Sequence, residues 1–564
     1  MSPCSNCHTA KIPCQYLTPK KRGPKTVQCQ NIHLQEPLGL TSPATHSPTE
    51  APDSPAPPAT TASSSSRAYS CSASDSRPFN TILANVLSTP PESQTQAAVR
   101  VHLDLLAGLL VAVPSDTPAL MANHCILLYA QYVFGTVHMC HEAALRATVN
   151  RFFFISPSGR RDDGDVDSEI LECFAADNER ERVEIFRNLT LLTALCAAVT
   201  YVLPESLLPN KHLTAPLFLR ASRETLKIYE DYDLECPNWS SLSIRLFLSS
   251  AIQVATGTHG VAFHIMSEAG VIAMRMRLYN EASLRGLDPV EENILRNAFW
   301  QLYVCDKTAL VVKGRPVAID EALFETKLTL QTHSQRTVPL FDYQGDSNAA
   351  KIQECLVEGF HVIRRLWTMA AHVTRAMESA SGGALDLHAD TGTYNQNIAQ
   401  LTEAYFEVIT MTSNHPVWVR SAEESSPDSN QESGDTEYQL SILQRQRTSY
   451  LITLHCIKVF VLSTAIQYNM TEVMGLSTDP LKLAMRHIEL AQDFLNVLES
   501  VPFLHLQAEG EHCAEKIRRV GSLLLELAHG TESDIVRSRA NDCAMRLIDI
   551  LARLNSKASD VMGQ

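Results

Sequence analysis

The sequence has 564 residues, of which 45% are apolar and 19% charged, with a net charge of −15. These values are ordinary for a folded globular protein and argue against a fibrous or fully disordered chain. No uninterrupted apolar run reaches the roughly 18 residues that a membrane span needs, and no apolar signal-peptide core follows Met1. The 15 cysteines are mostly single and scattered, which is typical of reduced thiols inside a cell.

Three cysteines near the amino terminus have the spacing of metal ligands. They form a C-x2-C-x6-C pattern made of Cys4, Cys7 and Cys14. Thiolates at this spacing can converge on one soft cation such as Zn²⁺, but a structural zinc site needs four ligands. The sequence leaves the fourth ligand open among three nearby side chains: His8, Cys29 and His33.

A basic segment lies beside these cysteines. Residues 1–25 contain five Lys or Arg and no acid, so the rest of the chain, at a whole-chain charge of −15, carries −20. Because an acidic body repels DNA and membranes, nucleic-acid contact is expected at this end alone. The cations suit DNA phosphates or a nuclear import signal, and a solvated charge run without function is the third interpretation. They are Lys11, Lys20, Lys21, Arg22 and Lys25.

The chain after this segment divides by composition. Residues 26–80 are rich in Pro, Ser, Thr and Ala, with few large apolar groups to offset the entropy of ordering. We expect a disordered linker there. From 81 to 560 the apolar residues recur at helical spacing, which predicts one large all-helical domain behind the linker and the short amino-terminal module.

Helices are predicted wherever this spacing persists. The clearest covers 288–312, where Asp288 suits the N-cap, Pro289 suits the first helical position, and Gly314 and Pro316 stop the helix. The other predicted helices cover 101–113, 118–134, 183–203, 242–256, 261–279, 351–377, 396–413, 438–468, 480–500, 511–528 and 533–555.

The amino-terminal pattern resembles one half of a known module. Pro3-Cys4-Ser5-Asn6-Cys7, then Pro13-Cys14-Gln15-Tyr16 and the basic run, are similar to the second half of the fungal zinc binuclear-cluster transcription factors. That family uses six cysteines to hold two zinc ions. The first three cysteines and the basic helix that reads DNA bases have no counterpart here, and Pro13 would interrupt a helix between Cys7 and Cys14. We expect either an upstream start of the chain or a natural truncation.

A second resemblance lies in the predicted helix 288–312. The run Ala298-Phe299-Trp300-Gln301-Leu302-Tyr303-Val304-Cys305-Asp306-Lys307, followed by Gly314-Arg315-Pro316, is similar to the fungal-specific transcription factor middle domain. In that family an aromatic helix leads into a Gly-Arg-Pro turn, and the domain regulates rather than catalyses. The order of cysteine module, linker and helical domain also matches the family.

Two features that suggest catalysis are weak. The acidic run from Asp162 to Asp167 lies among Gly, Ser and Pro and is expected to be a solvated loop, since Phe174 replaces the glutamate of a calcium loop. His141-Glu142 begins like a zinc-protease helix, but Leu145 stands where the second histidine belongs. The sequence contains no nucleophile elbow and no phosphate-binding loop. We therefore expect no enzymatic activity.

The resemblance implies a nuclear regulator of RNA polymerase II transcription. Cys4, Cys7 and Cys14 would hold Zn²⁺, and the five cations would contact double-stranded promoter DNA or direct nuclear import. The helical body would bind co-regulators, with a small-molecule effector and homodimerisation left open. Its targets would be genes of a metabolic pathway or a secondary-metabolite cluster. The alternative is a truncated paralogue that acts through protein interactions without binding DNA.

Overall fold

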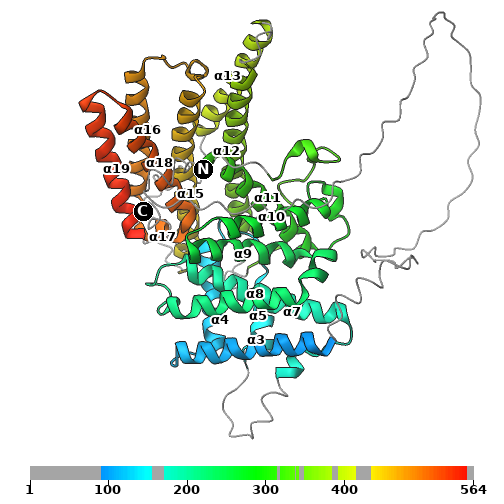
Figure 1. The fold of residues 1–564 in the computed structure, drawn as a ribbon. Helices are drawn as coiled ribbons and strands as arrows, with labels where there is room; N and C mark the ends of the chain where they lie inside the picture. The colour runs from blue at the N-terminus through cyan, green and yellow to red at the C-terminus, as the bar shows by residue number, and fades with distance from the viewer. Residues whose placement is uncertain are drawn as a thin grey trace, which may run out of the picture. The chain divides into compact units, whose positions relative to one another are not determined.

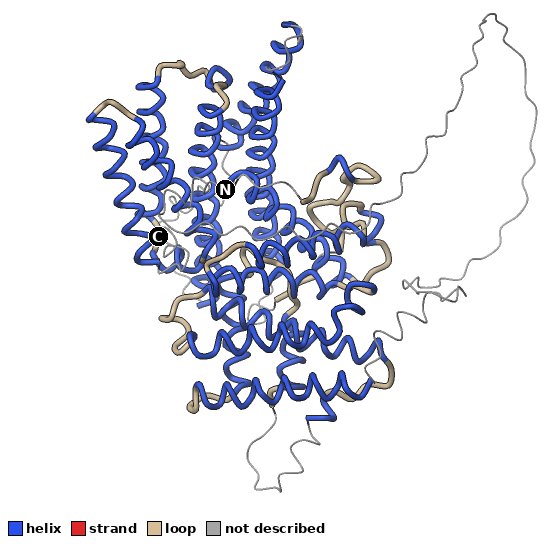
Figure 2. The backbone as a smooth tube through the Cα atoms, in the orientation of Figure 1, coloured by secondary structure: helices blue, strands red, loops and turns tan. Residues whose placement is uncertain are grey.

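The computed structural model describes most of the predicted helical body. The described residues are 91–154, 170–313, 318–336, 338–341, 349–383, 391–413 and 434–554. The chain divides into two units, 1–66 and 67–564, and every described residue belongs to the second. All regular elements within the described ranges are helices, without a strand (Figure 2). The all-α prediction is confirmed for this part of the chain.

Several predicted features lie outside the described residues. They are the cysteine module at 1–25, the linker at 26–80, the acidic run at 162–167 and the Gly314–Pro316 turn.

The first half of the body is built from layers of helices. Helix α7 packs against α8 and α9, α3 covers α8, and α10 packs on α9. Figure 1 shows α3, α8 and α9 crossing the view in successive layers. The bounds are α3 Pro91–Ala112, α4 Pro118–Leu128, α5 Glu142–Phe152, α7 Glu179–Val202, α8 Lys211–Glu235, α9 Trp239–Thr256, α10 Gly260–Arg275 and α11 Pro289–Lys313.

The second half is a set of helices that stand roughly upright in Figure 1. Helix α12 packs on α11 and α15, and α15, α16, α18 and α19 pack against one another in turn. Contacts of α11 with α12 and of α17 with α7 join the two halves. The bounds are α12 Ala349–Gly383, α13 Thr391–Ser413, α15 Gly434–Gln467, α16 Pro480–Ser500, α17 Phe503–Glu509, α18 Glu511–Gly530 and α19 Asp534–Leu554.

Local sequence signals place the starts of several helices. At α9 the Asn238 side chain accepts from the backbone while Ser241 bonds back to the Asn238 amide, which makes a capping box. At α11 the Asp288 carboxylate accepts from the Val290 amide at 2.9 Å, as the sequence predicts for its N-cap. Asp479 caps α16, whose first residue is Pro480.

Two predicted helices end earlier than expected. The range 261–279 ends as a helix at Arg275, because Arg277 takes a left-handed conformation with φ 54°. Tyr279 then accepts backbone bonds from Thr329 and Leu330 instead of continuing the helix. The range 118–134 changes at Tyr129 from an α-helix to one π-helical turn, Tyr129–Val133.

Three helices in the described ranges are long and apolar enough to cross a membrane, judged by length and composition. In α7 and α15, 83% and 67% of the apolar window is buried inside the fold. Their apolar character is therefore that of core helices. The window in α3 is 28% buried, and Leu110 and Val111 are exposed on its outer side.

Candidate functional site

The sequence-predicted metal and DNA residues lie outside the described part of the chain. These residues are Cys4, Cys7, Cys14, Lys11, Lys20, Lys21, Arg22 and Lys25. Their donor chemistry still bears on zinc: three thiolates suit Zn²⁺ but fall one ligand short of a tetrahedral shell. Within the described ranges, no group of three or more His, Cys, Asp or Glu side chains is placed to hold a metal ion.

The aromatic helix singled out by the sequence is a core element. Phe299, Trp300 and Tyr303 of α11 are at most 3% exposed. Trp300 Nε1 donates to the Gln331 carbonyl at 3.0 Å, and the Arg364 guanidinium lies 4.2 Å from the Trp300 ring centroid. These contacts place α11 between α12 and the segment around Gln331.

The Asp306–Lys307 pair on the same helix anchors the chain that follows the Gly-Arg-Pro segment. Asp306 Oδ1 accepts from the Ala318 amide at 2.6 Å, and Lys307 Nζ donates to the Ile319 carbonyl at 2.8 Å. Burial raises the pKa of Asp306 and lowers that of Lys307. With both groups engaged in this way, the motif serves to hold the fold together.

A pocket lies where the two halves of the helical body meet. Its volume is about 250 Å³, and its walls come from the segment 133–139 and from α7, α9, α10, α11, α12, α15, α17 and α18. Much of the wall is apolar, including Phe247, Phe263, Met266, Phe360 and Trp367. A pocket of this kind suits a small molecule with an apolar body.

One side of the pocket carries charged groups from α18. Arg518 Nη2 lies 2.9 Å from Glu511 Oε1, and Arg518 also pairs with Glu515. His259, at the start of α10, lies 3.6 Å from Glu515 Oε2. Arg518 thus pairs with both Glu511 and Glu515.

Two further charges are held by hydroxyls of α15. Glu509 Oε2 accepts from Ser449 Oγ at 2.9 Å, and Lys516 Nζ donates to Thr453 Oγ1 at 2.9 Å. The Lys516 ammonium also lies 5.6 Å from the centroid of the Trp367 ring. Lys516 is 6% exposed, so its charge is removed from bulk water.

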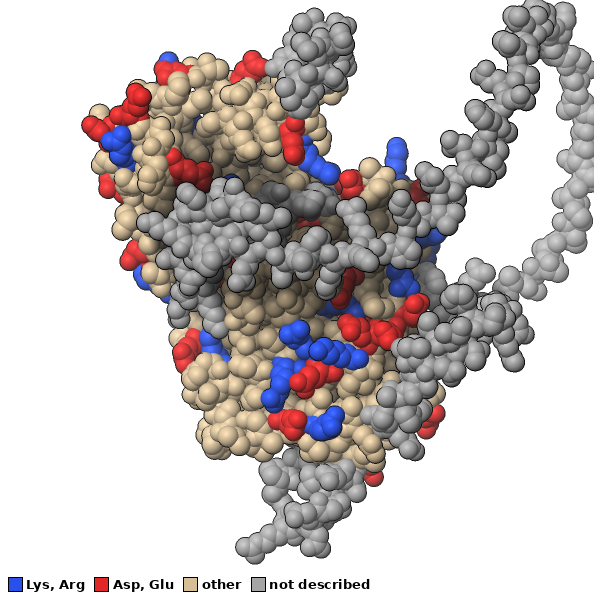
Figure 3. Space-filling model, in the orientation of Figure 1, with Lys and Arg blue, Asp and Glu red and all other residues tan. Residues whose placement is uncertain are grey.

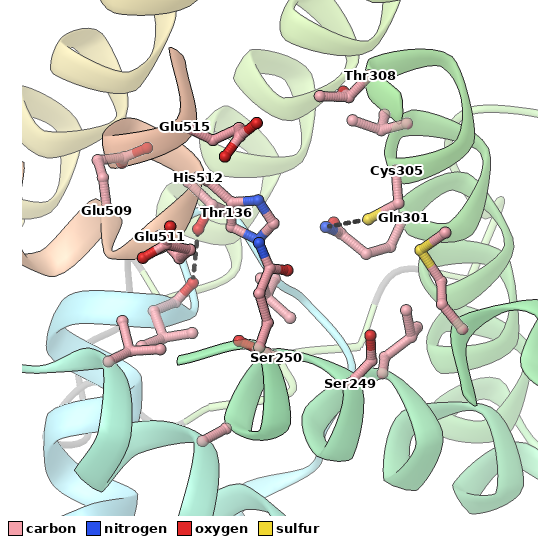
Figure 4. A pocket seen from close by; sticks show the side chains of 18 of the residues that line it. Thr136, Ser249, Ser250, Gln301, Cys305, Thr308, Glu509, Glu511, His512 and Glu515 are labelled. Atoms are coloured by element: carbon pink, nitrogen blue, oxygen red, sulfur yellow. Dashed lines mark hydrogen bonds between the residues drawn. The ribbon is translucent and has the colours of Figure 1, made fainter. Parts of the chain in front are cut away.

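The opposite wall presents polar groups from α11. In Figure 4, Gln301 projects into the pocket from the side facing His512. Gln301 Oε1 is buried and has no hydrogen-bond partner in the described structure, while Nε2 lies 3.8 Å from Cys305 Sγ. A buried amide oxygen without a donor is a site where a ligand can form a bond.

One thiol and two hydroxyls that line the pocket are not activated for nucleophilic attack. Burial raises the pKa of the Cys305 thiol to about 11, so Cys305 is not a thiolate nucleophile at neutral pH. Ser449 donates to Glu509 and Ser249 donates to the Ala262 carbonyl at 2.7 Å, so neither hydroxyl faces a histidine base. The charged and amide groups of the pocket can orient a ligand.

Sequence reasoning identifies none of the pocket's charged residues as a site. Glu509 bonds to Ser449, which is 60 residues earlier in the sequence, and Lys516 bonds to Thr453, which is 63 residues earlier. No spacing rule links such positions. The residue type of Lys516 does not single it out either, because Glu511 and Arg518 are also buried charged residues of α18.

Charges on the described surface have both signs. Figure 3 shows Lys and Arg interspersed with Asp and Glu on the face drawn. Comparison with protein families and with curated proteins yields no family model and no curated relative that matches this chain.

Proposed function

We propose that this chain is a nuclear, sequence-specific regulator of RNA polymerase II transcription of the fungal zinc-cluster type. The observation that carries the proposal is the C-x2-C-x6-C pattern of Cys4, Cys7 and Cys14 beside a run of cations. It binds promoter DNA in a Zn²⁺-dependent way and controls a metabolic pathway or a secondary-metabolite gene cluster. It acts by binding and has no catalytic role.

The distribution of charge supports this division of labour. The +5 segment contacts DNA phosphates, and the −20 remainder stays away from the duplex. Phosphate contacts by Lys20, Lys21, Arg22 and Lys25 release counterions, so affinity falls steeply as salt rises. The helical body, with its pocket between two helix groups, binds co-regulators and responds to a ligand.

Selection from a random duplex library tests this proposal without requiring that the target genes be identified. The 564-residue chain, purified with Zn²⁺, is expected to enrich a short common motif. A variant with Cys4→Ser, Cys7→Ser and Cys14→Ser is expected to enrich none, whereas the control Cys355→Ser is expected to select the same motif. Failure of the unaltered chain to enrich any motif would overturn the proposal.

A second candidate function is protein interaction without DNA reading. It is favoured by the sequence around the cysteines, which contains one cysteine triad and, between Cys7 and Cys14, Lys11 as the single Lys or Arg. A truncated paralogue of this kind keeps the helical body and modulates partners that bind DNA. Chromatin enrichment that survives the triple cysteine substitution but disappears when a partner is depleted would support it over direct DNA binding.

A further inference from the structure

The pocket wall contains a carboxylate and an ammonium that lack opposite charges. Each is held by one hydroxyl, Glu509 by Ser449 and Lys516 by Thr453. Among the described residues, neither ion has an oppositely charged group within 4.0 Å. The wall therefore contains one group of each sign whose charge a ligand can match.

The spacing of these two charges follows from the helix that holds them. Ser449 and Thr453 are four residues apart on α15, so they lie on one face with Cβ atoms about 5–6 Å apart. Glu509 and Lys516 therefore bond to successive turns on the same face of α15. A ligand that carries an amine and a carboxylate on neighbouring atoms can lie between them.

Burial makes the unmatched ammonium costly. Lys516 is 6% exposed, and one of its three donors is used by Thr453. A charge removed from water is unfavourable unless it is paired and hydrogen-bonded. A ligand carboxylate at this position would supply both the opposite charge and further acceptors.

The apolar part of the pocket favours a ligand whose remaining part is apolar. Phe247, Phe263, Met266 and Phe360 provide an apolar surface that a hydrocarbon or aromatic group can cover. A volume of about 250 Å³ admits one small molecule and excludes a folded peptide. Gln301 Oε1 offers one more acceptor to the ligand's donor groups.

We propose that this pocket binds a small zwitterion with an apolar body, of the class of aromatic and branched-chain amino acids. The ammonium of the ligand pairs with Glu509, its carboxylate pairs with Lys516, and its side chain lies against the phenylalanines. Binding itself does not depend on DNA recognition, but a role for the ligand as an effector rests on the proposed function.

Calorimetric titration of the 564-residue chain with three matched probes tests the proposal. The probes are L-phenylalanine, 3-phenylpropionate, which lacks the amine, and phenethylamine, which lacks the carboxylate. L-Phenylalanine is expected to bind at least tenfold more tightly than either analogue. Equal binding of 3-phenylpropionate, equal binding of phenethylamine, or no binding of any probe would each overturn the assignment.

Variants that remove one charge each test which ligand group pairs with Glu509 and which pairs with Lys516. Glu509→Gln is expected to abolish the preference for L-phenylalanine over 3-phenylpropionate, and Lys516→Met is expected to abolish the preference over phenethylamine. The controls Glu526→Gln and Lys482→Met change exposed residues outside the pocket and are expected to keep both preferences. If the pocket variants behave like the controls, the pairing is wrong.

The titrations distinguish loss of binding from loss of folding, and they are independent of DNA binding. The Glu509→Gln amide can still accept from Ser449, and thermal melting monitored by circular dichroism identifies any variant that does not fold. In that case the three-probe comparison on the unaltered chain decides the assignment. Because the titrations contain no DNA, a negative result removes the pocket assignment and leaves the library selection as a separate test of the proposed function.

Discussion

The Asp233 carboxylate and the Arg245 guanidinium lie 2.5 Å apart, and both side chains are fully buried. Arg187, which is 5% exposed, donates to the other Asp233 oxygen at 2.8 Å. The Ser241 hydroxyl donates to the same oxygen at 2.7 Å. These groups join α7, α8 and α9, so one carboxylate pairs with two buried arginines in the layered half.

Removing this carboxylate is expected to destabilise the protein strongly. Asp233→Ala removes the nearest counter-ion of two buried guanidinium groups and leaves each with one more distant carboxylate, Glu184 at 3.8 Å from Arg187 and Glu268 at 3.5 Å from Arg245. Breaking a buried pair in this way costs about 3–5 kcal/mol. The measurement is the free energy of unfolding from chemical denaturation. Asp231→Ala, on an exposed position of the same helix, is the matched control and is expected to change it by less than about 0.5 kcal/mol. A loss below about 1 kcal/mol in Asp233→Ala would contradict the role assigned to the pair.

Glycine-to-alanine substitutions at two sites of the second half are expected to have opposite effects. Gly510 joins α17 to α18 with φ 61° and ψ −143°, and an added Cβ would lie 2.9 Å from Val202 Cγ1. Gly510→Ala is therefore expected to destabilise by about 1–3 kcal/mol or more. Gly521 lies inside α18 with open space around its Cβ position, so Gly521→Ala is expected to stabilise by about 0.5–1 kcal/mol.

The shift in thermal midpoint of the two variants checks this prediction. The same atom is added in both, so a difference in sign reports backbone conformation and the Val202 contact. A stabilised Gly510→Ala variant would show that the α17–α18 junction does not require its left-handed residue.

The helical pattern of the sequence predicts most of the fold, and its failures have physical causes. Helix α16 is expected at 480–500 and occurs there, because Asp479 and Pro480 give a strong start signal. Helix α8 is not predicted from the sequence, because Pro216 and many charged residues interrupt its apolar pattern. In the structure Pro216 lies near the start of the helix at an exposed position, where it is tolerated. The short helix α5 is also not predicted, although its buried residues Leu145, Val149 and Phe152 recur at helical spacing.

The pocket is beyond sequence reasoning for a different reason. It depends on which helices meet in space, and the Ser449–Glu509 and Thr453–Lys516 bonds join separate helices. Periodicity identifies the buried face of a helix but does not identify its partner. The aromatic run of α11 is visible in the sequence, and in the structure it forms core contacts rather than the charged part of the pocket.

The buried histidines predict a loss of stability in acid. Burial lowers the pKa of His138 to about 3, of His102 to about 4 and of His487 to about 4. Their ordinary pKa in an unfolded chain is about 6.5. Between these values the unfolded state binds protons that the folded state does not, so the free energy of unfolding falls as pH falls from about 6.5 towards about 4.

One histidine can be separated from the others by substitution. His138 is 3% exposed and packs against Phe134 and Phe360, and its Nε2 has no hydrogen-bond partner in the described structure. His138→Phe is expected to reduce the slope of unfolding free energy against pH by about 1.4 kcal/mol per pH unit between about pH 4 and 6. His264→Gln, at a side chain that is 74% exposed, is the control and is expected to leave the slope unchanged.

The amino-terminal cysteines predict a weak zinc site when they are isolated from other ligands. A peptide of residues 1–30 contains Cys4, Cys7, Cys14 and Cys29, but lacks the first cysteine triad that completes a two-zinc cluster in the family it resembles. Because metal affinity depends on a full set of deprotonated ligands, we expect weak binding with mixed stoichiometry. Competition with a chromophoric chelator measures both quantities. Cys7→Ser is expected to weaken binding further, whereas Ser2→Ala is not. Tight and uniform one-to-one binding would instead show that three cysteines and a neighbouring Cys29 or histidine form a closed mononuclear site.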